Sequence, residues 1–151
     1  MFRKILYPTD FSDATHKAIQ FIKKLKEAGT EEVVILHVID DRTIHSLERY
    51  TAQYADMSLI VQDIKEKALQ AIGPIEEEFK ESGLKVKTRV EHGIPFSRIL
   101  QVEEEENVSL TVIGSHGRSN IASMLLGSVS EKVIRKSKKP VIVIKRENGG
   151  F

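Results

Sequence analysis

The sequence contains no cysteine, which excludes disulfide bonds, thiolate catalysis and cysteine-based zinc sites. No run of 18 apolar residues occurs, so no membrane span is expected. The first eight residues lack the apolar stretch of a secretory signal peptide. The formal net charge is only +1, which gives no overall field to attract nucleic acid or an anionic membrane. These absences leave cytoplasmic residence as the default expectation.

The length and composition of the chain favour one domain. A chain of 151 residues is large enough to bury about 70% of its unfolded surface in a single core. Its 40% hydrophobic and 30% charged residues are ordinary for a globular protein. We therefore expect a single domain over residues 1–151.

Strand-like and helix-like patterns alternate five times along the chain. The predicted strands cover residues 3–8, 33–39, 85–91, 110–113 and 141–144. The run at 33–39 shows no alternation, which is typical of a central parallel strand covered on both faces. The segment at 85–91 alternates apolar and charged residues, which favours an exposed edge strand. Strands separated by helices predict right-handed crossovers and a parallel sheet flanked by helices, an α/β fold.

The predicted helices have recognisable starts and stops. A long amphipathic helix is expected over residues 60–79, with a kink or a break at Gly73-Pro74. Another helix begins at Pro95 and ends in the acidic run 103–106, which we expect to be a solvated face. Ser128 and Glu131 have the spacing of a capping box that opens the last helix.

The most informative motif lies between the fourth strand and this last helix. Gly114 and Gly117 are followed, after nine intervening residues, by Gly127 and Ser128. Glycines leave main-chain N–H groups uncovered, and such groups at a helix N-terminus can cradle an anion. No glycine follows the first strand, so the dinucleotide fingerprint is absent, and no Gly-Lys-Ser/Thr occurs, so there is no P-loop.

Four segments resemble the universal stress protein family, and in particular its ATP-binding branch. They are Ile5-Leu-Tyr-Pro-Thr-Asp-Phe-Ser, Val112-Ile-Gly-Ser-His-Gly-Arg-Ser, Leu125-Leu-Gly-Ser-Val-Ser-Glu-Lys-Val and Lys139-Pro-Val-Ile-Val-Ile. The resemblance runs from about residue 2 to residue 145, and only residues 40–57 have no clear counterpart. It implies a Rossmann-like fold, similar to adenine nucleotide alpha hydrolases, with a five-stranded parallel sheet in the order 3-2-1-4-5. It also implies a site for ATP, ADP or AMP where the strand order reverses.

The same resemblance implies a set of nucleotide-binding residues. Asp10 would bind the ribose hydroxyls, Val38 would meet adenine through its backbone, and residues 127–130 would surround the outer phosphates. The full implied set is Pro8, Thr9, Asp10, Val38, Ile113, Gly114, Ser115, His116, Gly117, Gly127, Ser128, Val129 and Ser130. A divalent cation, Mg²⁺ or Mn²⁺, would be bound by the phosphates and not by a cage of protein ligands. No catalytic residue is implied.

Several of these residues have a plainer interpretation. Gly114 and Gly117 could be turn glycines, Ser128 could be an N-cap satisfied by its own helix, and Asp10 could cap the first helix. Residues 43–55 have an apolar helical face with three possible uses. They could pack on the surface of the domain, form a lid over the nucleotide, or contribute to a subunit contact.

The last strand indicates the oligomeric state. Residues 141–144 are apolar on both faces, yet the implied strand order places them at an edge of the sheet. A second copy would cover this edge, and in the universal stress protein family this strand commonly mediates homodimers. We therefore expect a homodimer.

The sequence favours nucleotide-dependent regulation over rapid catalysis. Hydrolysis needs a positioned water, a base and stabilisation of the transferred phosphoryl group, and no arginine or lysine is fixed at the γ-phosphate by spacing. We expect an ATP-binding stress-response protein with slow or partner-dependent hydrolysis, or alternatively a nucleotide-free dimeric interaction module of the same family. An adenylyl-transfer enzyme is disfavoured because Ser-Gly-Gly and His-x-Gly-His are absent, and a phosphoacceptor receiver domain because Glu91-His92 stands where an aspartate is needed.

Overall fold

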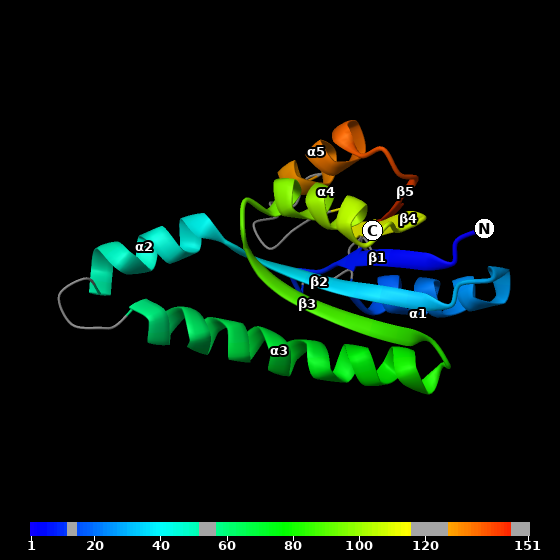
Figure 1. The fold of residues 1–151 in the computed structure, drawn as a ribbon, viewed down its shortest axis with the longest axis horizontal. Helices are drawn as coiled ribbons and strands as arrows, with labels where there is room; N and C mark the ends of the chain where they lie inside the picture. The colour runs from blue at the N-terminus through cyan, green and yellow to red at the C-terminus, as the bar shows by residue number, and fades with distance from the viewer. Residues whose placement is uncertain (12–14, 52–56, 116–126, 146–151) are drawn as a thin grey trace, which may run out of the picture.

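Five parallel strands form one sheet in the order β3-β2-β1-β4-β5, which confirms the predicted fold. The computed structural model describes residues 1–11, 15–51, 57–115 and 127–145 (Figure 1). The strands are β1 (Lys4–Pro8), β2 (Glu32–Asp40), β3 (Lys85–Gly93), β4 (Leu110–Gly114) and β5 (Val141–Ile144). The predicted edge position of β3 is confirmed, and the strand order reverses between β1 and β4.

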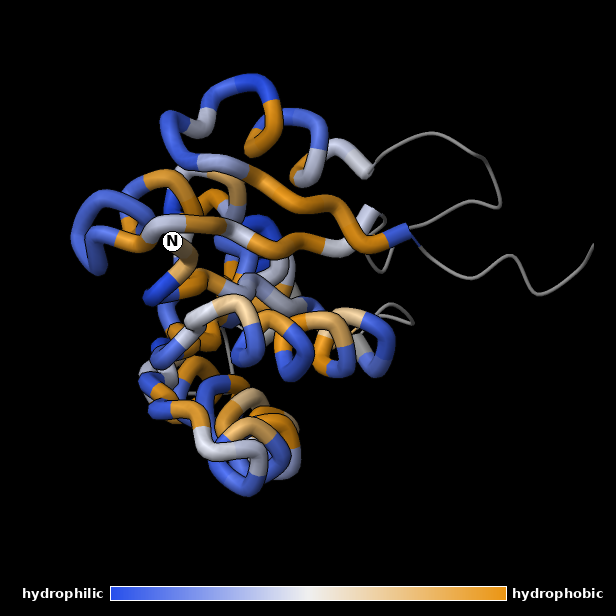
Figure 2. The backbone as a smooth tube through the Cα atoms, turned by 90° about the vertical axis from the view of Figure 1, so that its right-hand side faces the viewer, coloured by the Kyte–Doolittle hydropathy of each residue, from blue (hydrophilic) through white to orange (hydrophobic). Residues whose placement is uncertain are grey.

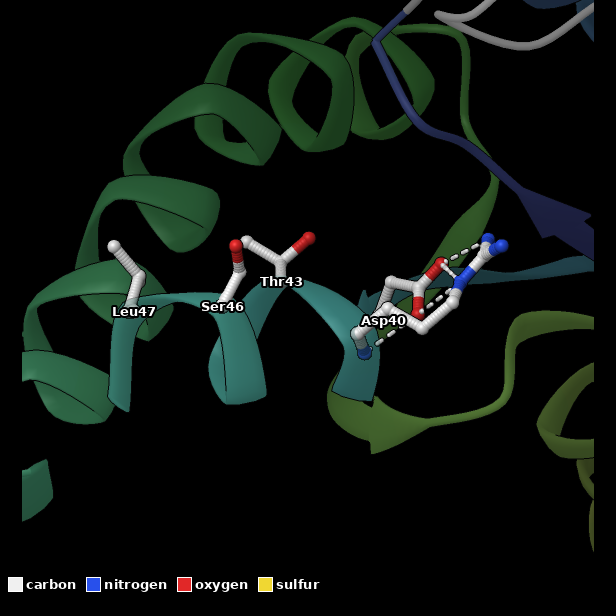
Figure 3. A pocket seen from close by; sticks show the side chains of 5 residues that line it. Asp40, Thr43, Ser46 and Leu47 are labelled. Carbon is white, nitrogen blue, oxygen red and sulfur yellow. Dashed lines mark hydrogen bonds and ion pairs between the residues drawn. The ribbon is translucent and has the colours of Figure 1, made fainter. Parts of the chain in front are cut away.

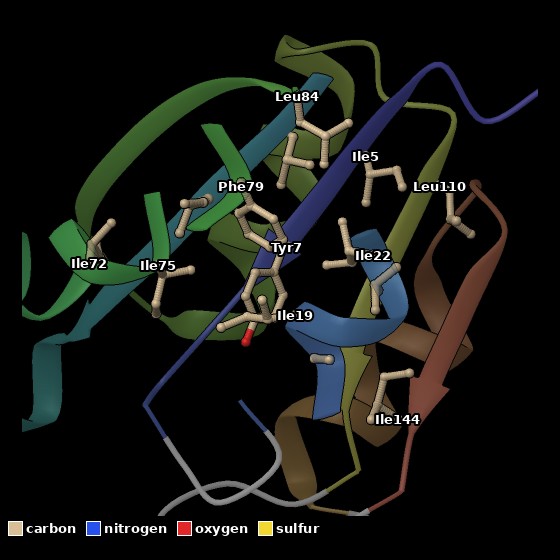
Figure 4. Close-up of a cluster of buried hydrophobic side chains, with 14 residues drawn as sticks. Ile5, Tyr7, Ile19, Ile22, Ile72, Ile75, Phe79, Leu84, Leu110 and Ile144 are labelled. Carbon is tan, nitrogen blue, oxygen red and sulfur yellow. The ribbon is translucent and has the colours of Figure 1, made fainter. Parts of the chain in front are cut away.

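The helices cover both faces of the sheet. They are α1 (Thr15–Leu25), the short 3-10 helix η1 (Lys26–Ala28), α2 (Asp41–Thr51), α3 (Met57–Glu81), α4 (Pro95–Glu105) and α5 (Ser128–Lys136). One core packs β1 and β2 against α1 and α3, and it includes Tyr7, Ile22 and Phe79 (Figure 4). The other packs the opposite face of the same strands against α4 and α5 and includes Leu36 and Val102. Burial on both faces explains why these strands are apolar without alternation.

Hydrophobic residues lie on the strands and on the helix faces that pack against them. In Figure 2 the hydrophobic stretches alternate with hydrophilic turns and hydrophilic helix faces. The helix α2 and the first half of α3 extend beyond the sheet (Figure 1), and this half of α3 has no fully buried side chain. Within the described part of the chain, no helix is long and apolar enough to cross a membrane.

The helix α3 runs without interruption through Gly73-Pro74, so the predicted break does not occur. Pro74 lacks an N–H group, which removes the intrahelical hydrogen bond to the carbonyl of Gln70. Ile72 and Ile75 on either side of this point are both buried in the core. Their packing keeps the two halves of the helix continuous despite the missing hydrogen bond.

The acidic run at 103–106 is only in part the solvated face that we expected, because Glu104 and Glu105 are exposed but the two outer residues of the run are buried. Glu103 is 1% exposed and Glu106 is 8% exposed. The carboxylate of Glu103 accepts hydrogen bonds from the hydroxyls of Thr111 at 2.8 Å and Ser137 at 2.8 Å. Glu106 lies under β3, where the ammonium group of Lys87 donates to it at 3.0 Å. The acidic run therefore ties α4 to β4, to the end of α5 and to β3.

Candidate functional site

The candidate site lies at the carboxyl ends of β1 and β4, where the strand order reverses. The two strands are paired neighbours in the sheet. The residues at and just after these ends, Thr9-Asp10 and Gly114-Ser115, therefore emerge at the same edge. In open parallel sheets a ligand is expected in the crevice at this point. The structure thus brings together the segment around Asp10 and the segment around Ser115, which lie about a hundred residues apart in the sequence.

Three hydrogen bonds among the described residues help to fix the loop after β1. The main-chain N–H of Thr9 donates to the carbonyl of Leu36 at 2.9 Å, and Nδ1 of His37 lies 2.8 Å from the carbonyl of Thr9. The N–H of Phe11 donates to Oγ1 of Thr9 at 3.0 Å. Phe11 has a left-handed backbone, with φ of 63°, which is rare for a non-glycine residue. Its ring lies on that of His37, with 4.7 Å between centroids.

Asp10 occupies the middle of this fixed loop, and it is partly exposed. Sequence reasoning did not identify His37 as part of the site. A signal was present, because His37 is the one polar residue in the apolar run at 33–39.

Hydrogen bonds connect the end of β4 to the start of α5. The N–H of Ser115 donates to the carbonyl of Ile144 at 2.9 Å, and the N–H of Gly127 donates to the carbonyl of Ser115 at 2.8 Å. The hydroxyl of Ser130 donates to the carbonyl of Gly114 at 2.6 Å. These contacts place the first turn of α5 beside the end of β4. His116 and Gly117, the other proposed residues of this motif, lie outside the described residues.

The helix α5 begins without a side-chain cap. Its N-cap residue is Gly127, with φ of −62° and ψ of 153°, and among the described residues no side chain caps the first turn. The predicted capping box is wrong: Ser128 is the first helical residue, and Glu131 pairs with Arg135 at 2.5 Å. The N–H groups of the first turn therefore have no acceptor within the helix, and the helix dipole favours an anion there.

The first turn of α5 supplies main-chain donors more than hydroxyl donors. Ser130 is 4% exposed, and its hydroxyl proton is used by Gly114. Ser128 is exposed at the very start of the helix. Val129 and Val38 pack against the core between the sheet and the helices α4 and α5, and Ile113 is part of that core. Pro8 is also buried, so the proposed site has an apolar floor and a polar rim.

An open hollow lies beside the carboxyl end of β2. It has a volume of about 440 Å³, is widely open to solvent and is lined by Asp40, Arg42, Thr43, Ser46 and Leu47 (Figure 3). Nη2 of Arg42 lies 2.6 Å from Oδ2 of Asp40, and the hydrogen bonds from Arg42 lower the pKa of that carboxyl. Thr43, Ser46 and Leu47 follow one side of α2. Sequence reasoning did not find this hollow, because it depends on how α2 leaves the sheet.

No three histidine, aspartate or glutamate side chains converge on a metal-binding position in the part of the chain that the structure describes.

Comparison with known proteins shows the family of the chain. A model described as the universal stress protein family matches residues 1–145, and the chain belongs to this family. It is similar to the universal stress protein MJ0577 of Methanocaldococcus jannaschii, with 39% identity over 98% of both chains. The solved structure of MJ0577 superposes with a TM-score of 0.87 over 99% of each chain. The universal stress protein YxiE of Bacillus subtilis is 32% identical over 96% of this chain and 100% of its own.

Two more distant structures of the family contain adenine nucleotides. One universal stress protein was solved in complex with cAMP, with 22% identity and a TM-score of 0.63 over 97% of this chain and 98% of that one. The universal stress protein of Archaeoglobus fulgidus was solved in complex with dAMP, with 20% identity and a TM-score of 0.64 over 96% and 100% of the two chains. At these identities the similarity to our chain shows a shared fold and nothing more.

Proposed function

We propose that this chain binds an adenine nucleotide, ATP foremost or ADP or AMP, and acts as a nucleotide-dependent regulatory protein of the stress response. The observation that supports this most directly is the start of α5, where uncapped main-chain N–H groups are tied beside the end of β4. The cAMP and dAMP complexes of the two relatives support an adenine nucleotide as the ligand.

Each part of the nucleotide is assigned to one part of the site. Asp10 binds the ribose hydroxyls, while Pro8, Thr9 and Val38 surround the base. The phosphates lie against the main chain after β4 and at the start of α5. The residues proposed for this part are Ile113, Gly114, Ser115, His116, Gly117, Gly127, Ser128, Val129 and Ser130. A divalent cation, Mg²⁺ or Mn²⁺, accompanies the phosphates and neutralises part of their charge.

The contacts of α5 favour slow or partner-dependent hydrolysis. Rapid phosphoryl transfer needs a cation at the transferred group. Arg135 of α5 pairs with Glu131. The ammonium groups of Lys132 and Lys136 lie 4.8 and 5.1 Å from the centre of the Phe96 ring. All three cations of this helix therefore have partners other than a nucleotide.

The exposed edge of β5 supports a homodimer. Val141, Ile142 and Val143 are only partly buried, although they are apolar and lie at the edge of the sheet. An exposed apolar edge strand is a template for pairing with another chain. A second copy of β5 would cover it.

Calorimetry of folded protein with magnesium and ATP tests the proposal, together with mass spectrometry of the small molecules released when freshly purified protein is denatured. We expect saturable heat that is lost in Gly127→Val, and an adenine nucleotide in the released fraction. No heat at millimolar ATP would contradict the proposal and favour the nucleotide-free dimeric interaction module. Brisk ATP turnover by the protein alone, lost in Gly127→Val, would contradict a regulatory role.

A further inference from the structure

We propose that His37 is a positioning residue of the nucleotide site, which holds Asp10 where its carboxylate meets the ribose hydroxyls. This inference rests on the proposed nucleotide binding and adds a residue that the motif comparison did not assign. His37 lies on β2, which is the neighbour of β1 in the sheet, and it acts on the loop after β1 from the side.

The first contact fixes the residue before Asp10. A carbonyl oxygen only accepts hydrogen bonds, so Nδ1 of His37 must carry the proton that it shares with the carbonyl of Thr9, 2.8 Å away. The N–H of Thr9 is already held by the carbonyl of Leu36 at 2.9 Å. Two consecutive residues of β2 therefore hold both polar groups of the Thr9 main chain.

The second contact fixes the residue after Asp10. Phe11 has the left-handed backbone by which the chain turns away from β1, with φ of 63°. Its ring lies over the imidazole of His37, at 4.7 Å and with 32° between the ring planes. A conformation that non-glycine residues rarely adopt persists only where the surroundings hold it. The same histidine thus supports the residues on both sides of Asp10.

Core packing alone does not explain a histidine at this position. Val33 and Ile35 precede it on the same face of β2, and both are fully buried in the core beneath α1 and α3. His37 itself is only partly buried. An aliphatic residue would continue that face without placing a polar ring there, and the covered part of such a ring is unfavourable unless it is hydrogen-bonded. The carbonyl of Thr9 supplies that hydrogen bond. The benefit of a histidine at this position is therefore that it holds the loop after β1.

Two substitutions separate the donor from the ring. His37→Phe keeps a ring for Phe11 but has no N–H for Thr9. His37→Asn places an amide N–H at the position of Nδ1 but removes the ring. Asp10→Asn serves as the reference for loss of the ribose contact, and His45→Asn is the matched control, since His45 is exposed on α2 and faces Glu48.

The readout is the ratio of affinities for ATP and 2′,3′-dideoxy-ATP, measured by calorimetry with magnesium. Wild-type protein and His45→Asn should favour ATP by about tenfold or more, as expected for hydrogen bonds to an ionised group. In His37→Phe and Asp10→Asn the preference should fall to about twofold, while the affinity for dideoxy-ATP stays within about threefold of the wild-type value. His37→Asn should keep most of the preference. Thermal unfolding followed by circular dichroism establishes that each variant is folded.

Each contrary outcome has a separate meaning. If the wild-type protein binds neither nucleotide, the proposed function is wrong and this inference fails with it. If Asp10→Asn loses the preference but His37→Phe keeps it, only the role of His37 is wrong. Equal loss of affinity for both nucleotides in His37→Phe would make His37 merely structural and would also overturn the inference. So would a His37→Asn variant that loses the preference as fully as His37→Phe.

Discussion

Replacing Gly127 by aspartate should stabilise the protein and weaken ATP binding at the same time. Gly127 has an extended backbone, with φ of −62° and ψ of 153°, which any residue adopts without strain. An aspartate at this N-cap position would accept hydrogen bonds from the N–H groups of the first turn of α5. Those are the groups proposed to bind phosphate, so the new carboxylate and the nucleotide would compete for them.

The two effects differ in size as well as in sign. An aspartate N-cap is better than glycine by a few tenths of a kcal/mol, and its charge at a helix N-terminus adds about 0.3–1 kcal/mol. For a chain of 151 residues a gain of about 1 kcal/mol raises Tm by roughly 2–4 °C. A carboxylate and a phosphate about 4 Å apart near a protein surface repel each other by about 4 kcal/mol. ATP affinity should therefore fall by at least about a hundredfold.

Thermal unfolding without nucleotide and calorimetry with magnesium-ATP measure the two effects on the same protein samples. Gly127→Ala controls for the added Cβ, and Gly127→Asn caps the helix without a charge, so it should stabilise the protein and weaken ATP binding less than aspartate does. Wild-type ATP affinity in Gly127→Asp would refute the proposed phosphate position. A lower Tm in both capping variants would refute the view that α5 lacks a cap.

Three further predictions concern the core, the acidic run and the assembly. Phe79→Ala should reduce the free energy of unfolding by about 3–5 kcal/mol in urea denaturation, since Phe79 is fully buried; a loss below about 1 kcal/mol would contradict its central place in the core. Burial acts to raise the pKa of Glu106, but hydrogen bonds from Lys87 and Lys4 outweigh it and hold this pKa below its ordinary value of 4.5. The stabilisation is therefore present above pH 4.5 and is lost as the pH falls through the folded-state pKa. Glu106→Gln should cost about 1–2 kcal/mol at pH 7, after allowance for the exposed Lys87 side chain, and progressively less in acid, whereas a cost independent of pH would contradict the ion-pair network. Light scattering at micromolar concentration should give twice the 17.1 kDa of one chain, and a monomer mass would exclude the homodimer.

The fold could be predicted because its signals are local. The apolar run at 33–39 predicts a strand covered on both faces, and Pro8 and Pro95 mark the end of a strand and the start of a helix. Each of these features depends on residues that are neighbours in the chain. The strand order needed more than the pattern, and it came from the resemblance to a family with that order.

The errors arose where partners are distant in the sequence. Glu103 and Glu106 look solvated as part of an acidic run, but their partners Thr111, Ser137 and Lys87 lie up to 34 residues away. The start of α5 was placed one residue too late for a similar reason. Gly127, and not Ser128, occupies the N-cap because its N–H is tied to Ser115 across the intervening segment.

The candidate site was only partly predictable from motifs. Asp10 and the glycines could be assigned by resemblance, because they belong to continuous motifs. His37 could not, since its role depends on β1 and β2 lying side by side, and a single histidine within an apolar run has no motif of its own. The hollow beside Asp40 was missed because it depends on how α2 leaves the sheet.

The two edges of the sheet differ in a way that limits how many copies can associate. Along β3 the side chains of Lys87 and Arg89 are engaged in ion pairs with Glu105, Glu106 and Glu91, so a strand added there would meet charge at alternate positions. Along β5 every residue is apolar. The proposed pairing through β5 would therefore leave the charged β3 strands at the outer edges of the combined sheet. In the proposed homodimer, growth of the sheet beyond two copies is therefore disfavoured.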